Sequence, residues 1–388
     1  MNPTNQPASA TADQPTATGE HGISAGTKVS AGSEEQMSQL LQLVVSHDAS
    51  DLHLTVGVKP MVRIDGVLHP VSDYQVMTPE RAEGMVNAVL SPEQKKRLKE
   101  EKEIDFSLAY EDKARFRVNV FHQRGYLAAA LRLIPMALRG YKELQLPGEI
   151  AGFAQMKQGL VLFAGPTGHG KSTTQAAIID DINSNRAEHI VTIEDPVEYT
   201  HVHKKSIVDQ REVGEDTKSF AMALRSVLRE DPDVVLIGEM RDPETMAAAM
   251  TIAETGHLVF ATVHTNDAPQ TIDRIVDSFP SYQQNQIRSQ LAQVLSGVVS
   301  QRLLPQIGGG RVPAVEIMIA DMAIRNLIRE GKSHQIPSAI QTSSEQGMVS
   351  MEKALAERIQ QGLIKYEDAA MYANDRKTLS KFVKGYEN

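Results

Sequence analysis

The sequence has 388 residues, with 40 lysines and arginines against 49 aspartates and glutamates, which gives a formal net charge of −9. It contains no cysteine, which excludes a disulfide framework, a Cys-ligated zinc or iron–sulfur centre and thiol catalysis. The length suggests two or three domains, and the acidic balance argues against nucleic acid as a partner.

Residues 1–33 are rich in small and polar side chains and contain no aromatic residue. They lack the basic, apolar and small-residue order of a secretory signal, so we expect a disordered tail. No stretch of the chain reaches the roughly 20 apolar residues of a membrane-spanning helix. The sequence therefore predicts a cytoplasmic location.

Residues 34–138 are predicted to form one small α/β domain. Apolar residues at helical spacing predict helices over 34–46 and 78–102. Alternating apolar residues predict two short strands on either side of Pro60, the second followed by the turn signal Asp65-Gly66. Three longer strands are predicted over 105–110, 115–121 and 127–134.

Residues 139–157 form a looser, glycine- and proline-containing stretch that we interpret as an interdomain linker. From residue 158 to the end, short apolar runs alternate with helical patterns, which predicts a second α/β domain with a mostly parallel sheet covered by helices on both faces. The predicted strands are 160–164, 189–194, 234–238 and 258–263.

A glycine-rich loop follows the first of these strands and fits the pattern G-x-x-x-x-G-K-[ST]. Glycines allow backbone N–H groups to surround a phosphate, the lysine brings positive charge to the β and γ phosphates, and the serine hydroxyl can ligate Mg²⁺. The sequence therefore predicts a nucleoside triphosphate site. The predicted binding residues are Gly165, Pro166, Thr167, Gly168, His169, Gly170, Lys171, Ser172 and Thr173.

His169 stands at a variable position of this loop. We expect it to be an exposed side chain without a specific role. Contact with the ligand or with a neighbouring subunit is the alternative.

Two acidic residues end predicted strands on the side where open α/β sheets place their sites. Glu194 ends the strand 189–194, and Glu239 directly follows the strand 234–238. Hydrolysis of a bound triphosphate needs a carboxylate that holds the metal or orients water, so both are candidates, with Glu239 and Ser172 as candidate metal ligands. Helix capping or ion pairing is the structural alternative.

His264 and His257 flank the strand 258–263, one at each end. His264 lies on the expected side of the sheet and is a candidate γ-phosphate sensor. His257 lies at the opposite end, and for either residue a purely structural histidine is the alternative.

Arginines alternate with apolar residues in the predicted strand 115–121. This period of two places Arg115 and Arg117 on one face, and Arg132 in the next strand can join them. They are either solvated arginines or a basic cluster that faces the nucleotide of an adjacent subunit.

The motifs taken in order resemble the PilT family of secretion ATPases, the retraction ATPases of type IV pili. The resemblance spans about residues 36–385 and includes Ala49-Ser-Asp-Leu-His-Leu54, Arg63-Ile-Asp-Gly66, the loop 165–172, Thr192-Ile-Glu-Asp-Pro-Val-Glu198, Leu228-Arg-Glu-Asp-Pro-Asp233, Gly238-Glu-Met-Arg-Asp242, Ala253-Glu-Thr-Gly-His257, Thr262-Val-His-Thr265 and Ala323-Ile-Arg-Asn-Leu-Ile-Arg-Glu330.

The resemblance implies a PAS-like N-terminal domain and a RecA-like ATPase domain in a homohexameric ring, with nucleotide between subunits. It also implies ATP and Mg²⁺ as ligands, an inner-membrane pilus platform protein and a paralogous retraction ATPase as partners, and a location at the cytoplasmic side of the pilus base.

The resemblance further implies roles for individual residues. Glu194 would activate the attacking water, Glu239 would belong to the Walker B element, and His257 and His264 would form the His box. Arg115, Arg117 and Arg132 would approach the phosphates from the first domain. Unlike the family pattern, His169 replaces a small residue.

The segment 323–330 predicts a short amphipathic helix capped by Asp321, with Arg325 and Arg329 on a second face. An ordinary surface helix is the alternative to the role in retraction that the resemblance implies. The predicted function is an ATP-hydrolysing motor for pilus retraction; the alternatives are an accessory PilU-like ATPase, a RecA-type nucleic-acid translocase and a non-enzymatic nucleotide-binding scaffold.

Overall fold

The computed structural model describes residues 32–47, 49–64, 66–111, 114–134 and 138–383. Residues 1–31 of the expected tail lie outside this part of the chain, as does Asp65 of the expected turn. The chain divides into two compact units between Leu133 and Ile134, and each is described by itself. Among the described residues, no helix has the length and apolar character needed to cross a membrane.

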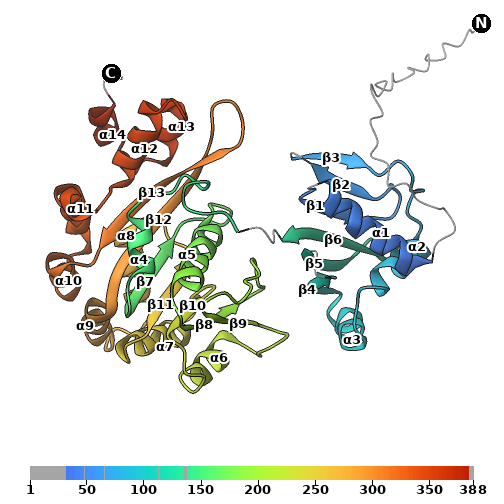
Figure 1. Cartoon of the computed structure of the whole chain (residues 1–388), viewed down its shortest axis with the longest axis horizontal. Helices are drawn as coiled ribbons and strands as arrows, with labels where there is room; N and C mark the ends of the chain where they lie inside the picture. Colours follow the sequence, from blue (N-terminus) through green and yellow to red (C-terminus); the bar gives the residue numbers. More distant parts are fainter. Residues whose placement is uncertain (1–31, 48, 65, 112–113, 135–137, 384–388) are drawn as a thin grey trace, which may run out of the picture. The chain divides into compact units, whose positions relative to one another are not determined.

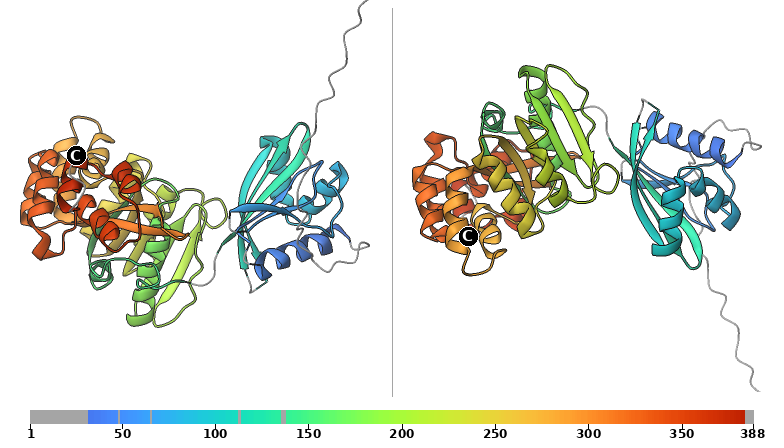
Figure 2. Two further views of the ribbon diagram at one scale, coloured as in Figure 1. Left: turned by 90° about the horizontal axis from the view of Figure 1, so that it is seen from above. Right: turned by 90° about the horizontal axis from the view of Figure 1, so that it is seen from below.

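The first unit is a six-stranded sheet with helices on one face (Figures 1 and 2). The strands lie in the order β3-β2-β1-β6-β5-β4. They are β1 (Asp51–Leu54), β2 (Met61–Ile64), β3 (Val67–Pro70), β4 (Glu103–Tyr110), β5 (Ala114–Gln123) and β6 (Tyr126–Ile134). The helices are α1 (Ser33–Ser46), α2 (Pro79–Asn87) and α3 (Pro92–Glu101).

The core of this unit lies between the helices and the inner face of the sheet. Phe116, Val118 and Val120 of β5 are fully buried there, beside the apolar side chains of α1. Their alternation with Arg115 and Arg117 follows from the period of two along a strand, which sends successive side chains to opposite faces.

The prediction of a single helix over 78–102 is wrong, because two helices occupy this range. Ser91 caps α3: its hydroxyl accepts from the Gln94 N–H, and the Gln94 side chain accepts from the Ser91 N–H. Pro92 stands at the first helical position, where its missing N–H costs nothing. This capping box begins a new helix in the middle of the predicted one.

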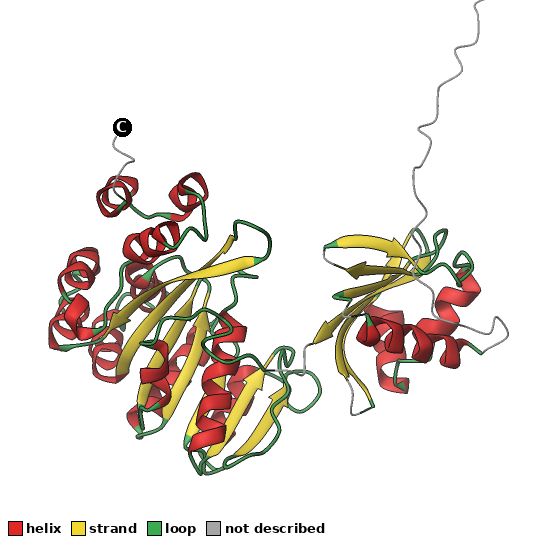
Figure 3. Ribbon diagram, turned by 45° about the horizontal axis from the view of Figure 1, so that its top comes forward, coloured by secondary structure: helices red, strands yellow, loops and turns green. Residues whose placement is uncertain are grey.

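The second unit is a seven-stranded sheet covered by helices on both faces (Figure 3). The strand order is β13-β12-β7-β11-β10-β8-β9, in which the six strands from β12 to β9 are parallel and β13 is antiparallel. The strands are β7 (Gly159–Ala164), β8 (His189–Glu194), β9 (Ile207–Glu212), β10 (Val234–Ile237), β11 (Leu258–Val263), β12 (Leu295–Pro305) and β13 (Arg311–Ile319).

The helices of this unit are α4 (Ile150–Ala154), α5 (Lys171–Asn185), α6 (Phe220–Val227), α7 (Pro243–Glu254), α8 (Ala268–Asp277), α9 (Gln284–Val294), α10 (Met322–Arg329), α11 (Ile336–Thr342), α12 (Met351–Gln360), α13 (Tyr366–Tyr372) and α14 (Arg376–Phe382). The predicted parallel sheet is confirmed, and the four predicted strands agree with β7, β8, β10 and β11 to within a residue at either end.

The stretch 139–157, which the sequence predicts as a linker, contains α4. Ile150 and Phe153 of this helix are buried against β7 and β11, and Tyr141 and Met156 pack at the border of the same cluster. The segment thus contributes apolar side chains to the core of the second unit.

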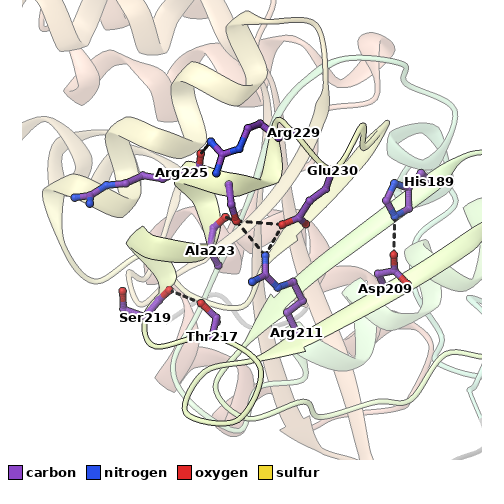
Figure 4. A network of polar contacts seen from close by, with 10 residues as sticks. His189, Asp209, Arg211, Thr217, Ser219, Ala223, Arg225, Arg229 and Glu230 are labelled. Atoms are coloured by element: carbon purple, nitrogen blue, oxygen red, sulfur yellow. Dashed lines mark hydrogen bonds and ion pairs between the residues drawn. The ribbon is translucent and has the colours of Figure 1, made fainter.

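A polar network connects β9 to the segment that follows α6 (Figure 4). The Arg211 guanidinium donates to Glu230 Oε1 at 2.6 Å and to the Ser226 hydroxyl at 3.2 Å. On the same strand, Asp209 lies 2.9 Å from the His189 ring. The Arg211–Glu230 contact attaches the motif 228–233 to the edge strand of the sheet.

Candidate functional site

The glycine loop connects the end of β7 to the start of α5, and two of its glycines cannot be replaced without strain. A Cβ at Gly165 would lie 2.6 Å from the Gln301 carbonyl oxygen, and one at Gly170 would lie 2.7 Å from the Gln301 amide nitrogen. Both glycines also have positive φ, +141° and +83°. The backbone of the loop therefore packs directly on β12.

Lys171 is only 6% exposed, and its amine is bound by the loop itself. Nζ donates to the carbonyl oxygens of Gly165 at 2.7 Å and Pro166 at 2.9 Å. Burial lowers the pKa of this amine to about 8. A phosphate in the loop would offer the amine charged acceptors, which bind more strongly than neutral carbonyls.

Glu194 is buried at the end of β8, where three groups donate to its carboxyl oxygens. Oε1 accepts from the Thr192 hydroxyl at 2.7 Å and from the Gln210 amide at 3.3 Å, and Oε2 accepts from the Glu198 N–H at 3.3 Å. Burial nevertheless raises the pKa of Glu194. A carboxyl whose pKa is raised and whose orientation is held by donors has the properties of a general base.

Glu239 follows β10 and lies beside His264, which follows β11. Glu239 Oε2 is 3.5 Å from His264 Nε2, and Oε1 is 2.6 Å from Arg241 Nε without hydrogen-bond geometry. Burial and the positive charge of Lys171 lower the pKa of His264. Lys171, Glu239 and His264 are therefore brought together at one edge of the sheet, at the carboxyl ends of parallel strands.

The site suits Mg²⁺ as a ligand bound together with phosphate. Glu239 Oε1 is a buried oxygen that accepts no hydrogen bond and lies 2.6 Å from Arg241 Nε, and Ser172 is the second residue of α5, directly after Lys171. The described residues include no group of three or more His, Asp or Glu side chains able to hold a metal unaided.

His257 lies at the amino end of β11, away from this edge. Its carbonyl accepts from the Gly159 N–H at the start of β7, and its ring lies 3.0 Å from the Thr255 hydroxyl and 3.1 Å from the Ile252 carbonyl. Within one chain the structure thus does not bring His257 to the phosphate loop.

The three predicted arginines lie on the sheet face of the first unit that points away from its helices. Arg115 Nε donates to the Ser107 hydroxyl at 2.5 Å, and Arg117 is exposed on the same strand. Arg132 Nε donates to Asp51 Oδ1 at 2.9 Å. Asp51, which is 7% exposed, also lies 3.6 Å from Arg63 Nε.

The expectation of an exposed His169 side chain is wrong. His169 is half-buried, its Nδ1 accepts a hydrogen bond from the Leu303 N–H at 3.0 Å, and its ring packs edge-on against Tyr372. The side chain turns back from the loop onto β12 and α13, a contact between segments far apart in the sequence.

Two residues, Gln301 beside the phosphate loop of the second unit and Asp51 beside the arginines of the first unit, were not predicted from the sequence. Gln301 on β12 accepts from the Thr174 hydroxyl at 2.8 Å and packs on the loop glycines, and Asp51 binds Arg132. The available signal was three polar residues, 300–302, within an otherwise apolar run, and an aspartate next to a strand start.

A parallel sheet with a glycine loop, a buried lysine and acidic residues at its carboxyl edge defines a P-loop nucleotide-binding domain. The model of the family described as Type II/IV secretion system protein matches residues 28–371. The chain belongs to this family and is a P-loop ATPase.

Its relatives include proteins of type IV pili. The type IV pilus retraction ATPase PilT of Pseudomonas aeruginosa is 46% identical over 333 residues, 86% of this chain and 96% of that protein. The type IV pilus ATPase PilU of the same organism is 40% identical over 90% of this chain and 91% of its own length. A crystal structure of the pilus retraction motor PilT with bound ADP superposes with a TM-score of 0.83 at 49% identity, covering 89% of this chain and 98% of that one.

Proposed function

We propose that this chain is an ATP-hydrolysing motor that powers the retraction of type IV pili. The observation that carries the proposal is the meeting of Lys171, Glu239 and His264 at one edge of the second sheet. The chain that contains this edge is similar to a retraction ATPase over 86% of its own length and 96% of the relative's length. The similarity to a retraction motor with bound ADP supports nucleotide as the ligand of this edge.

In the proposed mechanism, backbone N–H groups of the glycine loop hold the phosphates of ATP, and Lys171 moves its amine from the loop carbonyls to the β and γ phosphates. Glu194 accepts a proton from the attacking water, a role that its raised pKa favours. His264 contacts the γ phosphate, and its ring, 3.5 Å from Glu239, links the phosphate to that carboxylate.

Ser172 and Glu239 are the proposed residues for Mg²⁺, the latter directly or through water. When bound, Mg²⁺ supplies positive charge that offsets the charge on the phosphate oxygens. Glu239 Oε1 is buried and accepts no hydrogen bond, which supports this assignment; Mg²⁺ bound there directly would replace its ion pair with Arg241.

We propose a homohexameric ring in which Arg115, Arg117 and Arg132 of one subunit face the nucleotide of its neighbour. These arginines share a sheet face that the helices of their unit leave uncovered, which supports a role in contact with another surface. His257, which its own chain keeps away from the loop, is likewise proposed to act at a subunit boundary.

The proposed partners are an inner-membrane platform protein of the pilus and a paralogous retraction ATPase, with the ring at the cytoplasmic face of the membrane. The similarity to PilU makes an accessory retraction ATPase the second candidate function. The higher identity to PilT favours the principal motor.

Gene deletion followed by complementation tests the proposal. Cells without the protein should carry excess surface pili and lose twitching, and bald cells would instead indicate an assembly motor. Lys171→Ala should fail to complement and lack ATPase activity, whereas Glu194→Gln should bind ATP and not hydrolyse it. Purified Lys171→Ala with full turnover would refute the site.

A further inference from the structure

The phosphate loop contacts two segments that lie more than a hundred residues later in the chain, and His169 makes both contacts. Its Nδ1 accepts from the Leu303 N–H on β12 at 3.0 Å. Its ring centre lies 6.0 Å from that of Tyr372 with an interplanar angle of 63°, the edge-to-face arrangement that aromatic pairs favour.

The charges around His169 keep its imidazole neutral. Burial lowers the pKa of His169, and the cations of Arg302 on β12, Lys171 in the loop and Arg311 on β13 lower it further. Only the neutral ring has a lone pair for the Leu303 N–H, because both nitrogens of the charged ring are donors. The hydrogen bond and the surrounding charges therefore favour the same state.

Tyr372 belongs to a separate apolar cluster rather than to the core beneath the loop. It ends α13 and packs at the border of the cluster formed by α12, α13 and α14 with Leu304 of β12 and Val312 of β13. The neighbouring Gly168 carbonyl also lies 3.5 Å from the Arg311 guanidinium on β13. The β12–β13 hairpin and α13 thus enclose the middle of the loop from one side.

We propose that His169 and Tyr372 are positioning residues through which the C-terminal helices hold the phosphate loop in its nucleotide-binding conformation. The inference rests on the proposed binding of nucleotide by this loop and adds a second segment, α12–α14, to the determinants of affinity. Alanine or serine at position 169 would reach neither the Leu303 N–H nor the Tyr372 ring.

The expected effect is on binding rather than on the chemical step. A loop that has lost its anchor must be ordered when the phosphates bind, and this cost raises Kd and KM while the bound state reacts as before. A hydrogen bond and an aromatic ring pair each make a modest net contribution to the free energy that holds the loop, and His169→Ala loses both. We therefore expect this variant to raise the Kd for ADP about five-fold or more.

The test is a double-mutant cycle on the full-length protein, with ADP binding measured by calorimetry and ATPase kinetics measured in parallel. His169→Ala and Tyr372→Ala should each raise Kd and KM, with kcat within about two-fold of the starting protein. The double variant should be no weaker than His169→Ala, because the same ring contact is lost in both.

Two conservative variants separate the contacts and remain informative if an alanine variant fails to fold. His169→Asn keeps an acceptor near the position of Nδ1 and loses the ring, so its Kd should equal that of Tyr372→Ala. Tyr372→Phe keeps the ring and should bind ADP as the unsubstituted protein does.

Additive effects of the two alanine substitutions, or an unchanged Kd in His169→Ala, would overturn the inference. A fall in kcat at unchanged Kd would also overturn it. Failure of the proposed function looks different, since the unsubstituted protein would then bind no ADP at all.

Discussion

Arg325 and Arg329 are one helical turn apart on α10, yet the structure predicts opposite consequences for their replacement. Arg325 is half-buried and donates to the carbonyl oxygens of Ala320 at 2.8 Å and Ala292 at 2.7 Å, and also to that of Gln293. Ala292 and Gln293 belong to the last turn of α9, whose carbonyls have no partners within the helix. Arg329 is exposed, and its guanidinium donates to Asn326 of its own helix.

Arg325→Glu should therefore destabilise the second unit. Hydrogen bonds from a charged donor are worth ~1.5–3 kcal/mol each, and partial exposure of Arg325 reduces this, so the loss of the α9 contacts costs ~2–4 kcal/mol. A carboxylate at the negative end of α9 adds a further unfavourable ~0.5 kcal/mol. For a unit of this size the sum corresponds to a fall in Tm of ~5–15 °C.

Thermal unfolding of the two purified variants, followed by circular dichroism, measures this difference. Arg329→Glu is the matched control and should unfold within ~2 °C of the unsubstituted protein. Equal Tm values for both variants would refute the capping role of Arg325. Under the proposed function, Arg329→Glu should keep its ATPase activity and lose twitching, so Arg329 is the cleaner probe of motor coupling.

Three further predictions concern buried charges. Asp51 holds the Arg132 guanidinium in place, so Asp51→Asn should let this side chain move and should raise the KM for ATP several-fold in steady-state kinetics, with Tm changed little. An unchanged KM would argue against Arg132 near the phosphates. Because the pKa of Lys171 is lowered to about 8, the amine loses its proton above that pH, and the Kd for ADP by calorimetry should rise about eight-fold from pH 7.5 to 9; a flat profile would contradict this. Burial raises the pKa of Glu316 to about 7, so this carboxyl lowers the free energy of unfolding progressively as the pH rises from its ordinary pKa of 4.5 to about 7, and the loss stays complete above that pH. Glu316→Gln should therefore raise Tm at pH 8 and change it little at pH 4.5.

Four strands of the second sheet were predictable because they are buried on both faces. β7, β8, β10 and β11 are short, nearly continuous apolar runs. Such a run of four to six residues is typical of a parallel strand that is covered by helices on both faces. The glycine loop was predictable for a different reason. Its backbone conformation excludes side chains at Gly165 and Gly170, so the loop requires glycine at these positions and the sequence shows it directly.

β12 and β13 were not predicted, because the hairpin carries polar side chains whose partners are distant in the chain. Ser300 donates to Glu316 on the facing strand, Gln301 binds Thr174, and Arg302 donates to Asn266. A polar residue inside an apolar run indicates a loop unless the partner that satisfies it is known.

The sequence by itself determined the parallel sheet, the phosphate loop and the acidic residues that follow its strands, because each depends on local composition and on the order of elements along the chain. The tertiary structure decided which side chains meet. It separates His257 from His264, binds Arg132 to Asp51, assigns Arg325 to the end of α9, and turns His169 from the loop toward Leu303 and Tyr372. These pairings depend on packing between segments far apart in the chain, and a local sequence pattern cannot predict such packing.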